Sequence, residues 1–156
     1  MSPEKRLTAL GLTLPALRPS AGAYLPFRWA GNLLFVSGRG ATRSDGRFMT
    51  GRVGLDVSVD QARLHARDAG LQLLAAAKAA LGDLERIGAV VKLTGMVNAV
   101  EGFTEHPAVI DGCSQLLADV LGEAGRHART SMGVASLPHG MSVEIETILW
   151  ADRPSG

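Results

Sequence analysis

The stretch from Met141 to Trp150 constrains the fold most, because apolar and polar residues alternate along its whole length. A strand with this period of two places successive side chains on opposite faces of a sheet. One face is mainly apolar and carries Met141, Val143, Ile145, Thr147 and Leu149. The opposite face carries Ser142, Glu144, Glu146, Ile148 and Trp150. A sheet built around this strand therefore needs another layer of structure to cover its apolar face.

Two long helices are predicted, and they could form that layer. The first begins at Ser58, where Gln61 three residues later makes a capping box, and ends near Gly82. Its leucines form one predicted apolar stripe of Leu64, Leu71, Leu74 and Leu81. The second helix spans roughly His106 to Ala124 and ends at Gly125. Its predicted apolar stripe is Ile110, Cys113, Leu117, Val120, Leu121 and Ala124.

The remaining patterned segments are predicted strands. Tyr24 to Ala30 and Leu33 to Ser37 are joined by a tight Gly31-Asn32 turn, and a short strand is expected near Phe48. Ala89 to Ala99 and Ala128 to Ala135 are two further strands. The order of strands, helix, strand, helix and two strands predicts an α+β fold in which two helices cover one face of a mixed sheet.

A short helix is predicted near the N-terminus. Ser2 is suited to the N-cap, Pro3 to the first helical position and Gly11 to the stop. We interpret residues 1–20 as a helical extension of a single domain that spans 1–156, because 156 residues are typical of one domain.

Composition excludes several classes of function. Lys and Arg number 16 against 15 Asp and Glu, so the net charge of +1 gives no overall basic field for nucleic acid. The local basic stretch of Arg39, Arg43, Arg47 and Arg52 is interpreted as a solvated loop. No apolar run approaches the ~18 residues of a membrane span. The sole cysteine, Cys113, is expected in the core, and no motif indicates a metal or cofactor. We therefore expect a cytoplasmic protein.

Arg129 is the most informative single residue, because it lies in an otherwise small and apolar predicted strand. A buried arginine must be paired or must bind an anion. If the last two strands pair antiparallel across the Pro138 turn, Arg129 can approach Glu144 or Glu146. Two interpretations follow. The pair is a structural ion pair, or the arginine binds a substrate carboxylate while a glutamate holds a water.

Two sets of motifs resemble the YjgF/Rid (reactive intermediate deaminase) family, also called endoribonuclease L-PSP. Tyr24 ahead of the Gly31-Asn32 turn, followed by Leu34-Phe35-Val36-Ser37-Gly38, resembles the opening of that family. Its closing signature resembles Ala128-Arg129-Thr130-Ser131, Leu137-Pro138 and Val143-Glu144-Ile145-Glu146. The resemblance extends from about Tyr24 to Trp150, and its other features are typical of a divergent branch.

The resemblance implies a chorismate-mutase-like fold with ferredoxin-like topology, and a homotrimer with sites in clefts between subunits. It implies hydrolysis of reactive 2-imino or enamine acids to 2-keto acids and ammonia, without a cofactor. By resemblance, Arg129 would hold the substrate carboxylate and Glu144 the attacking water. Tyr24, Gly38 and Ser131 would line the same pocket.

Three positions depart from the family pattern. Ser131 stands where the deaminase branch commonly has cysteine, Pro107 where asparagine is frequent, and Arg39 where glutamine is usual. One alternative is therefore a non-catalytic trimer that binds small carboxylates or 2-keto acids. A second alternative is an endoribonuclease or translation inhibitor, although the near-zero net charge argues against nucleic acid as a partner.

Overall fold

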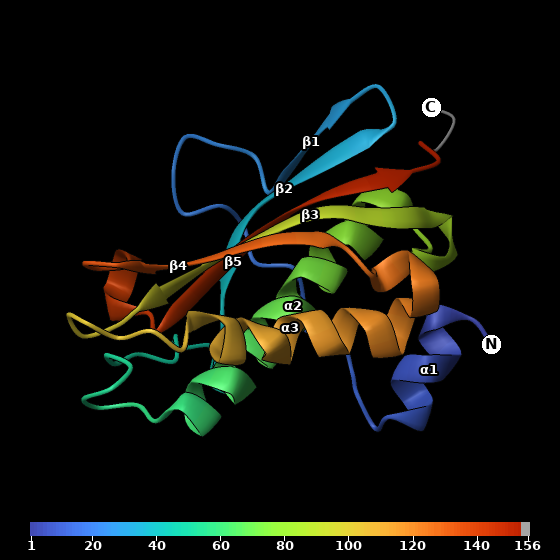
Figure 1. Cartoon of the computed structure of the whole chain (residues 1–156). Helices are drawn as coiled ribbons and strands as arrows, with labels where there is room; N and C mark the ends of the chain where they lie inside the picture. Colours follow the sequence, from blue (N-terminus) through green and yellow to red (C-terminus); the bar gives the residue numbers. More distant parts are fainter. Residues whose placement is uncertain (154–156) are drawn as a thin grey trace.

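A five-stranded mixed sheet carries two long helices on one face (Figure 1) in the computed structural model, which describes residues 1–153. The helices are α2 (Val59–Leu81) and α3 (His106–Leu121). The strands are β1 (Phe27–Ala30), β2 (Leu33–Gly40), β3 (Ile87–Asn98), β4 (Ala128–Val134) and β5 (Val143–Ala151), in the spatial order β1-β2-β5-β3-β4. The predicted α+β class, with helices on one face, is confirmed.

The predicted antiparallel pairing of the last two strands is wrong. β4 is an edge strand that pairs parallel with β3, whereas β5 lies between β2 and β3 and pairs antiparallel with both. The reason is the α3 crossover, because a strand, helix and strand connection returns the chain in the same direction. β5 instead occupies the centre of the sheet, where its alternating pattern buries one face under the helices.

The start and end of α2 are as predicted, and its predicted apolar stripe is confirmed except at Leu64. Ser58 and Gln61 form the capping box, and Gly82 closes the helix with a φ of 78°. Leu74 and Leu81 are buried and Leu71 packs against the core, whereas Leu64 is 64% exposed. The other buried residues of α2 are mostly small and are Ala62, Ala66, Ala69, Gly70, Ala75, Ala76 and Ala77. These small side chains let the α3 backbone approach closely.

The α3 prediction is largely confirmed. Ile110, Cys113, Leu117 and Val120 are all buried in the core. The α-helix ends at Leu121, before Ala124, and a 3-10 turn over Gly122–Gly125 follows. Burial raises the pKa of the Cys113 thiol to about 12, so this cysteine is an unreactive core residue.

Other boundaries differ modestly from the predictions. β1 begins at Phe27, so Tyr24 lies outside the strand. Near Phe48 the chain forms only an isolated bridge to Thr42. Residues 1–153 contain no helix with the length and apolar content of a membrane span. Within the same residues, no three His, Cys, Asp or Glu side chains gather as metal ligands would.

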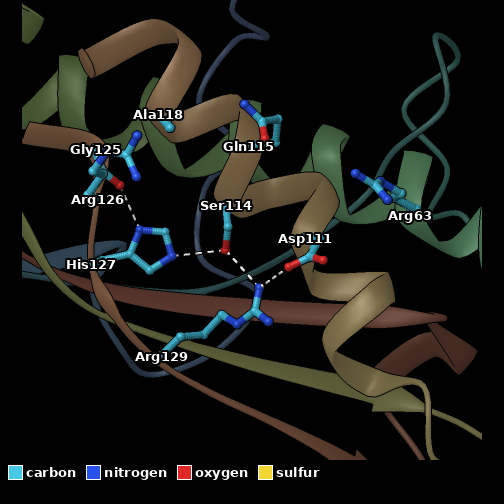
Figure 2. A pocket seen from close by; sticks show the side chains of 9 residues that line it. All are labelled: Arg63, Asp111, Ser114, Gln115, Ala118, Gly125, Arg126, His127 and Arg129. Atoms are coloured by element: carbon cyan, nitrogen blue, oxygen red, sulfur yellow. Dashed lines mark hydrogen bonds and ion pairs between the residues drawn. The ribbon is translucent and has the colours of Figure 1, made fainter. Parts of the chain in front are cut away.

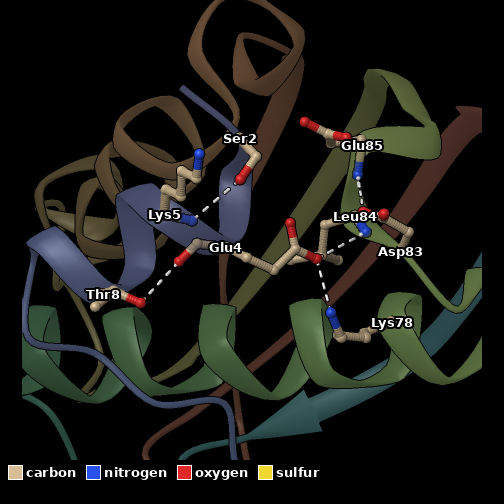
Figure 3. A network of polar contacts seen from close by, with 8 residues as sticks. All are labelled: Ser2, Glu4, Lys5, Thr8, Lys78, Asp83, Leu84 and Glu85. Atoms are coloured by element: carbon tan, nitrogen blue, oxygen red, sulfur yellow. Dashed lines mark hydrogen bonds and ion pairs between the residues drawn. The ribbon is translucent and has the colours of Figure 1, made fainter.

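The N-terminal helix α1 (Pro3–Ala9) docks on the end of the helical layer (Figure 3). Ser2 caps it as predicted, and Leu7 is buried. The Glu4 carboxylate accepts hydrogen bonds from Lys78 Nζ at 2.7 Å and from the Leu84 amide at 3.1 Å. This carboxylate therefore ties α1 to the C-terminal end of α2 and to the turn that precedes β3.

Glu4 gives a prediction for the pH dependence of stability. Burial alone would raise the pKa of Glu4, but the hydrogen bonds from Lys78 and the Leu84 amide outweigh it and lower the pKa. A lowered folded-state pKa means that the contribution is present above the unfolded pKa and is lost as pH falls through the folded one. Because the pair is partly exposed, we expect Glu4→Gln to cost about 0.5–1 kcal/mol near neutral pH and much less near pH 3.

Urea unfolding of the wild type and Glu4→Gln at both pH values measures this difference. The control is Glu85→Gln, because the side chain of Glu85 is exposed on the neighbouring turn. An equal cost of Glu4→Gln at both pH values would contradict the assigned role of the carboxylate.

Candidate functional site

Arg129 lies on the edge strand β4 and reaches toward α3, on the face of the sheet that the helices cover. Its Nη1 donates to Asp111 Oδ1 at 2.7 Å and to Ser114 Oγ at 3.0 Å. Its Nη2 makes only a long bond, 3.4 Å, to the Pro107 carbonyl. The side chain keeps 21% of its surface exposed. The guanidinium is thus held by α3, and part of it still faces solvent.

A pocket of about 400 Å³ opens beside Arg129 (Figure 2). Arg63 from α2 and Arg126 from the segment before β4 also line it, and Asp111 is its acidic member. Three guanidinium groups against one carboxylate leave the pocket positively charged. Such a pocket favours small anions, and a planar guanidinium is well matched to a carboxylate.

The ion-pair partner of Arg129 within the chain is Asp111. The predicted strand pairing would have placed Glu144 or Glu146 beside it. The Arg129 side chain shares its face of the sheet with Leu93 and Thr147, with which its backbone is in register through β3. Glu144 lies three positions from Thr147 on β5 and therefore points to the opposite, uncovered face. The ion pair was not predictable from sequence because it depends on how α3 crosses β4.

Glu144 lies directly over Gly38. A Cβ built on Gly38 would come within 2.6 Å of Glu144 Oε1, so only glycine leaves this carboxylate its position. A bulge in β2 between Val36 and Arg39 shapes the backbone at this point. Burial raises the pKa of Glu144, and the nearby charge of Glu146 raises it further. A carboxylate with a raised pKa is a stronger proton acceptor.

Tyr24 and Ser131 occupy different surroundings. Tyr24 is 54% exposed and borders a second pocket, of about 620 Å³, together with Phe35 and Glu146 on the uncovered side. Ser131 follows Arg129 by two positions on β4 and shares its face. Among residues 1–153, the buried Ser131 Oγ has no hydrogen-bond partner.

The five predicted site residues thus form two groups. Arg129 and Ser131 lie on the helix-covered side at the edge of the sheet, while Tyr24, Gly38 and Glu144 belong to the uncovered side. Within one chain the structure does not bring the two groups together. Any site that uses both groups needs a second copy of the chain.

One polar contact beside the first group has no sequence signal. His127 Nε2 lies 2.9 Å from Ser114 Oγ (Figure 2). The two residues are separated by the end of α3 and the turn after it, and their spacing matches no simple motif. Only the way the turn folds back on α3 reveals the pair.

Comparisons with known proteins agree on one family. A family model described as "YjgF/chorismate_mutase-like, putative endoribonuclease" matches residues 4–145. Protein TCP17 of Trypanosoma cruzi is 41% identical over 144 residues, covering 92% of this chain and 90% of that protein. A crystal structure of a protein of unknown function from Agrobacterium tumefaciens is 49% identical, with a TM-score of 0.88 and coverage of 96% and 94% of the two chains.

Two further solved structures are similar to this chain. A protein from Shewanella oneidensis described as a putative endoribonuclease is 33% identical, with a TM-score of 0.93 and coverage of 96% and 99% of the two chains. RidA from the Antarctic bacterium Psychrobacter is 24% identical, has a TM-score of 0.60 and covers 88% and 95%. The RidA likeness is one of fold alone.

Proposed function

This chain belongs to the YjgF/chorismate-mutase-like family, and from that premise we propose that it hydrolyses reactive 2-imino or enamine acids. In the proposal, Arg129 anchors the substrate carboxylate and Glu144 positions the attacking water. The observation that carries it is the state of Glu144, a half-buried carboxylate over Gly38 whose raised pKa suits it to accept a proton.

The proposed active assembly is a homotrimer with sites between subunits. Two features support it. The two groups of site residues lie on opposite sides of one sheet, and a head-to-tail ring places one side of a subunit against the other side of its neighbour. The uncovered face also leaves large apolar side chains exposed, among them Phe35, Met132 and Trp150, which contact with a second copy would bury.

The proposed chemistry needs little beyond orientation. The Arg129 guanidinium binds the substrate carboxylate, and a water attacks the imine carbon while Glu144 takes one of its protons. Glu144 passes that proton to the nitrogen, which gives an amino alcohol. The hydroxyl proton then moves to the nitrogen as the C–N bond breaks, so ammonia leaves and the carbon becomes the keto carbon. Placing the water and the substrate together lowers the entropic part of the barrier.

A Glu144→Gln variant tests the proton acceptor. We expect its rate of 2-imino acid hydrolysis to fall by about 10²–10⁴-fold, because the amide cannot accept the proton of the water. In the wild type, activity should decline as pH falls through the raised pKa of Glu144. The assay follows the decay of 2-imino acids that an amino acid oxidase generates, against buffer alone.

Glu146→Gln is the matched control for this experiment. It removes the neighbouring charge that raises the pKa of Glu144, so activity should persist and its acid limb should move to lower pH. A wild-type protein that does not speed imine decay beyond buffer would refute the proposed reaction.

A second candidate function is binding of a small carboxylate without catalysis. The contact with Asp111 favours binding without catalysis. Arg129 Nη1 already donates to this carboxylate, so a ligand must bind the remaining N–H groups of the guanidinium. The serine at position 131, in place of the family cysteine, favours it too. Saturable binding of 2-keto acids in calorimetry without imine turnover would support this candidate. The endoribonuclease alternative is supported by the descriptions of the matching family and of the Shewanella oneidensis protein as putative endoribonucleases.

A further inference from the structure

We propose that Ser114 and His127 form a nucleophile–base pair, a second reactive site that hydrolyses small activated esters with a negatively charged acyl part. Ser114 Oγ lies 2.9 Å from His127 Nε2, and His127 Nδ1 lies 2.7 Å from the Gly125 carbonyl oxygen (Figure 2). This is the arrangement of an activated serine, in which a third group orients the base. The inference does not rest on imine hydrolysis.

The hydrogen-bond partners assign the direction of each proton. The Gly125 carbonyl can only accept, so His127 Nδ1 carries the hydrogen. In the neutral ring Nε2 then bears the lone pair, and the Ser114 hydroxyl must donate to it. Arg129 Nη1 donates to Ser114 Oγ at 3.0 Å and uses one of its lone pairs. All three bonds agree on a serine proton directed at the base.

The charge of the surroundings favours the reactive form of the pair. Burial lowers the pKa of His127, the Gly125 bond opposes that effect, and the Arg129 charge adds to it. The ring is therefore neutral at neutral pH, as a general base must be. The Arg129 guanidinium at 3.0 Å also stabilises negative charge on Ser114 Oγ and on an oxyanion formed beside it.

The pocket defines the class of substrate. Ser114 and His127 both line the pocket of about 400 Å³, so the pair is open to a small molecule. Arg63 and Arg126 line the same pocket and are exposed. Arg126 already pairs with Glu123 at 3.2 Å, so Arg63 provides most of the positive charge away from the reacting atoms. A substrate that carries a carboxylate at the far end of its acyl chain matches this distribution.

The proposed reaction proceeds in two balanced steps. Ser114 Oγ attacks the ester carbonyl carbon and its proton passes to His127 Nε2. The alcohol leaves with that proton as the C–O bond breaks. Water then attacks the acyl-serine and gives one proton to His127. The acyl–Oγ bond breaks, Ser114 regains a proton and the carboxylic acid departs.

The chain contains an internal comparison, because Ser142 Oγ also lies 2.7 Å from a histidine nitrogen, Nδ1 of His65. Ser142, however, is fully buried and can also donate to the Met49 carbonyl at 3.4 Å. Ser142 therefore has a histidine as hydrogen-bond partner but is not accessible to solvent. A reagent that reacts with serine hydroxyls should therefore distinguish the two residues.

The test treats the full chain with diisopropyl fluorophosphate, which forms an Oγ–phosphorus bond and expels fluoride, and locates the adduct by peptide mass spectrometry. We expect labelling at Ser114 in the wild type and in Ser142→Ala, and none in Ser114→Ala. His127→Gln should slow labelling by at least about 10²-fold, since the general base is lost. The rate of p-nitrophenyl hemisuccinate hydrolysis should fall in the same variants as the labelling. The wild type should hydrolyse the hemisuccinate faster than p-nitrophenyl acetate, which lacks the carboxylate.

A second variant guards against misfolding of the first. Ser114→Cys keeps the size of the side chain, and its alkylation by iodoacetamide should be slowed by adding His127→Gln, because the thiolate then loses its base. Labelling of Ser114 no faster than that of Ser142, or rates that His127→Gln leaves unchanged, would overturn the proposal. Loss of imine hydrolysis in Glu144→Gln with normal Ser114 labelling would show that the Ser114 reaction is independent of imine hydrolysis, because Glu144 lies on the opposite face of the sheet.

Discussion

An equimolar mixture of Arg129→Ala and Glu144→Gln subunits, unfolded and refolded together, is expected to recover about a quarter of the wild-type imine-hydrolysis rate. In the proposed homotrimer, each variant alone should be nearly inactive, because every cleft then lacks the carboxylate anchor or the proton acceptor. In a mixed ring, a cleft works when its Arg129 comes from one variant and its Glu144 from the other. Random assembly places them so at about one cleft in four.

The matched control mixes Glu144→Gln with Gly38→Ala. A methyl group on Gly38 would come within 2.6 Å of Glu144 Oε1, so both changes damage the same group of residues. No cleft in that mixture has an intact copy of this group beside it, and no activity should return. An inactive but assembled mixture of Arg129→Ala and Glu144→Gln would contradict a cleft that takes Arg129 from one subunit and Glu144 from its neighbour.

Gly112→Ala is expected to lower the free energy of unfolding strongly. A Cβ on Gly112 of α3 would overlap the backbone carbonyl of Arg63 on α2, and backbone cannot move aside as a side chain can. Overpacking of this kind costs about 1–3 kcal/mol or more. We expect roughly 3 kcal/mol, which for a domain of this size lowers Tm by roughly 6–12 °C.

Thermal unfolding by circular dichroism measures the effect. The sign is informative, because alanine in place of glycine within a helix otherwise stabilises by up to about 1 kcal/mol. Gln115→Ala on the exposed side of α3 is the control, and we expect it to stay within about 0.5 kcal/mol. A rise in Tm for Gly112→Ala would mean that the two helices do not pack this closely.

Local patterns predicted the elements of the fold well. The capping box at Ser58, the alternation from Met141 to Trp150 and the apolar stripe that includes Ile110 and Leu117 depend on neighbours in sequence. The element order then limited the architecture to helices over one face of a mixed sheet. The structure confirms these features, and they were predictable because they depend on short-range spacing.

Long-range contacts were the source of the errors. Nothing near Arg129 in sequence shows that β4 pairs with β3 rather than with β5, and this pairing decides which carboxylate the arginine meets. The exposed Leu64 has the same origin, because its leucine spacing is locally good while the distance between α2 and α3 favours alanine. The Ser114–His127 pair likewise depends on a turn whose path no local signal reveals.

The position of Cys113 has a practical consequence for any study of this chain in solution. Its sulfur is the sole native thiol and lies fully buried in the core, with a pKa of about 12. Alkylating reagents, fluorophores and spin labels should therefore ignore the native chain. A cysteine introduced anywhere on the surface would be a unique attachment point, so the proposed homotrimer could be probed by distance measurements without first removing a natural residue.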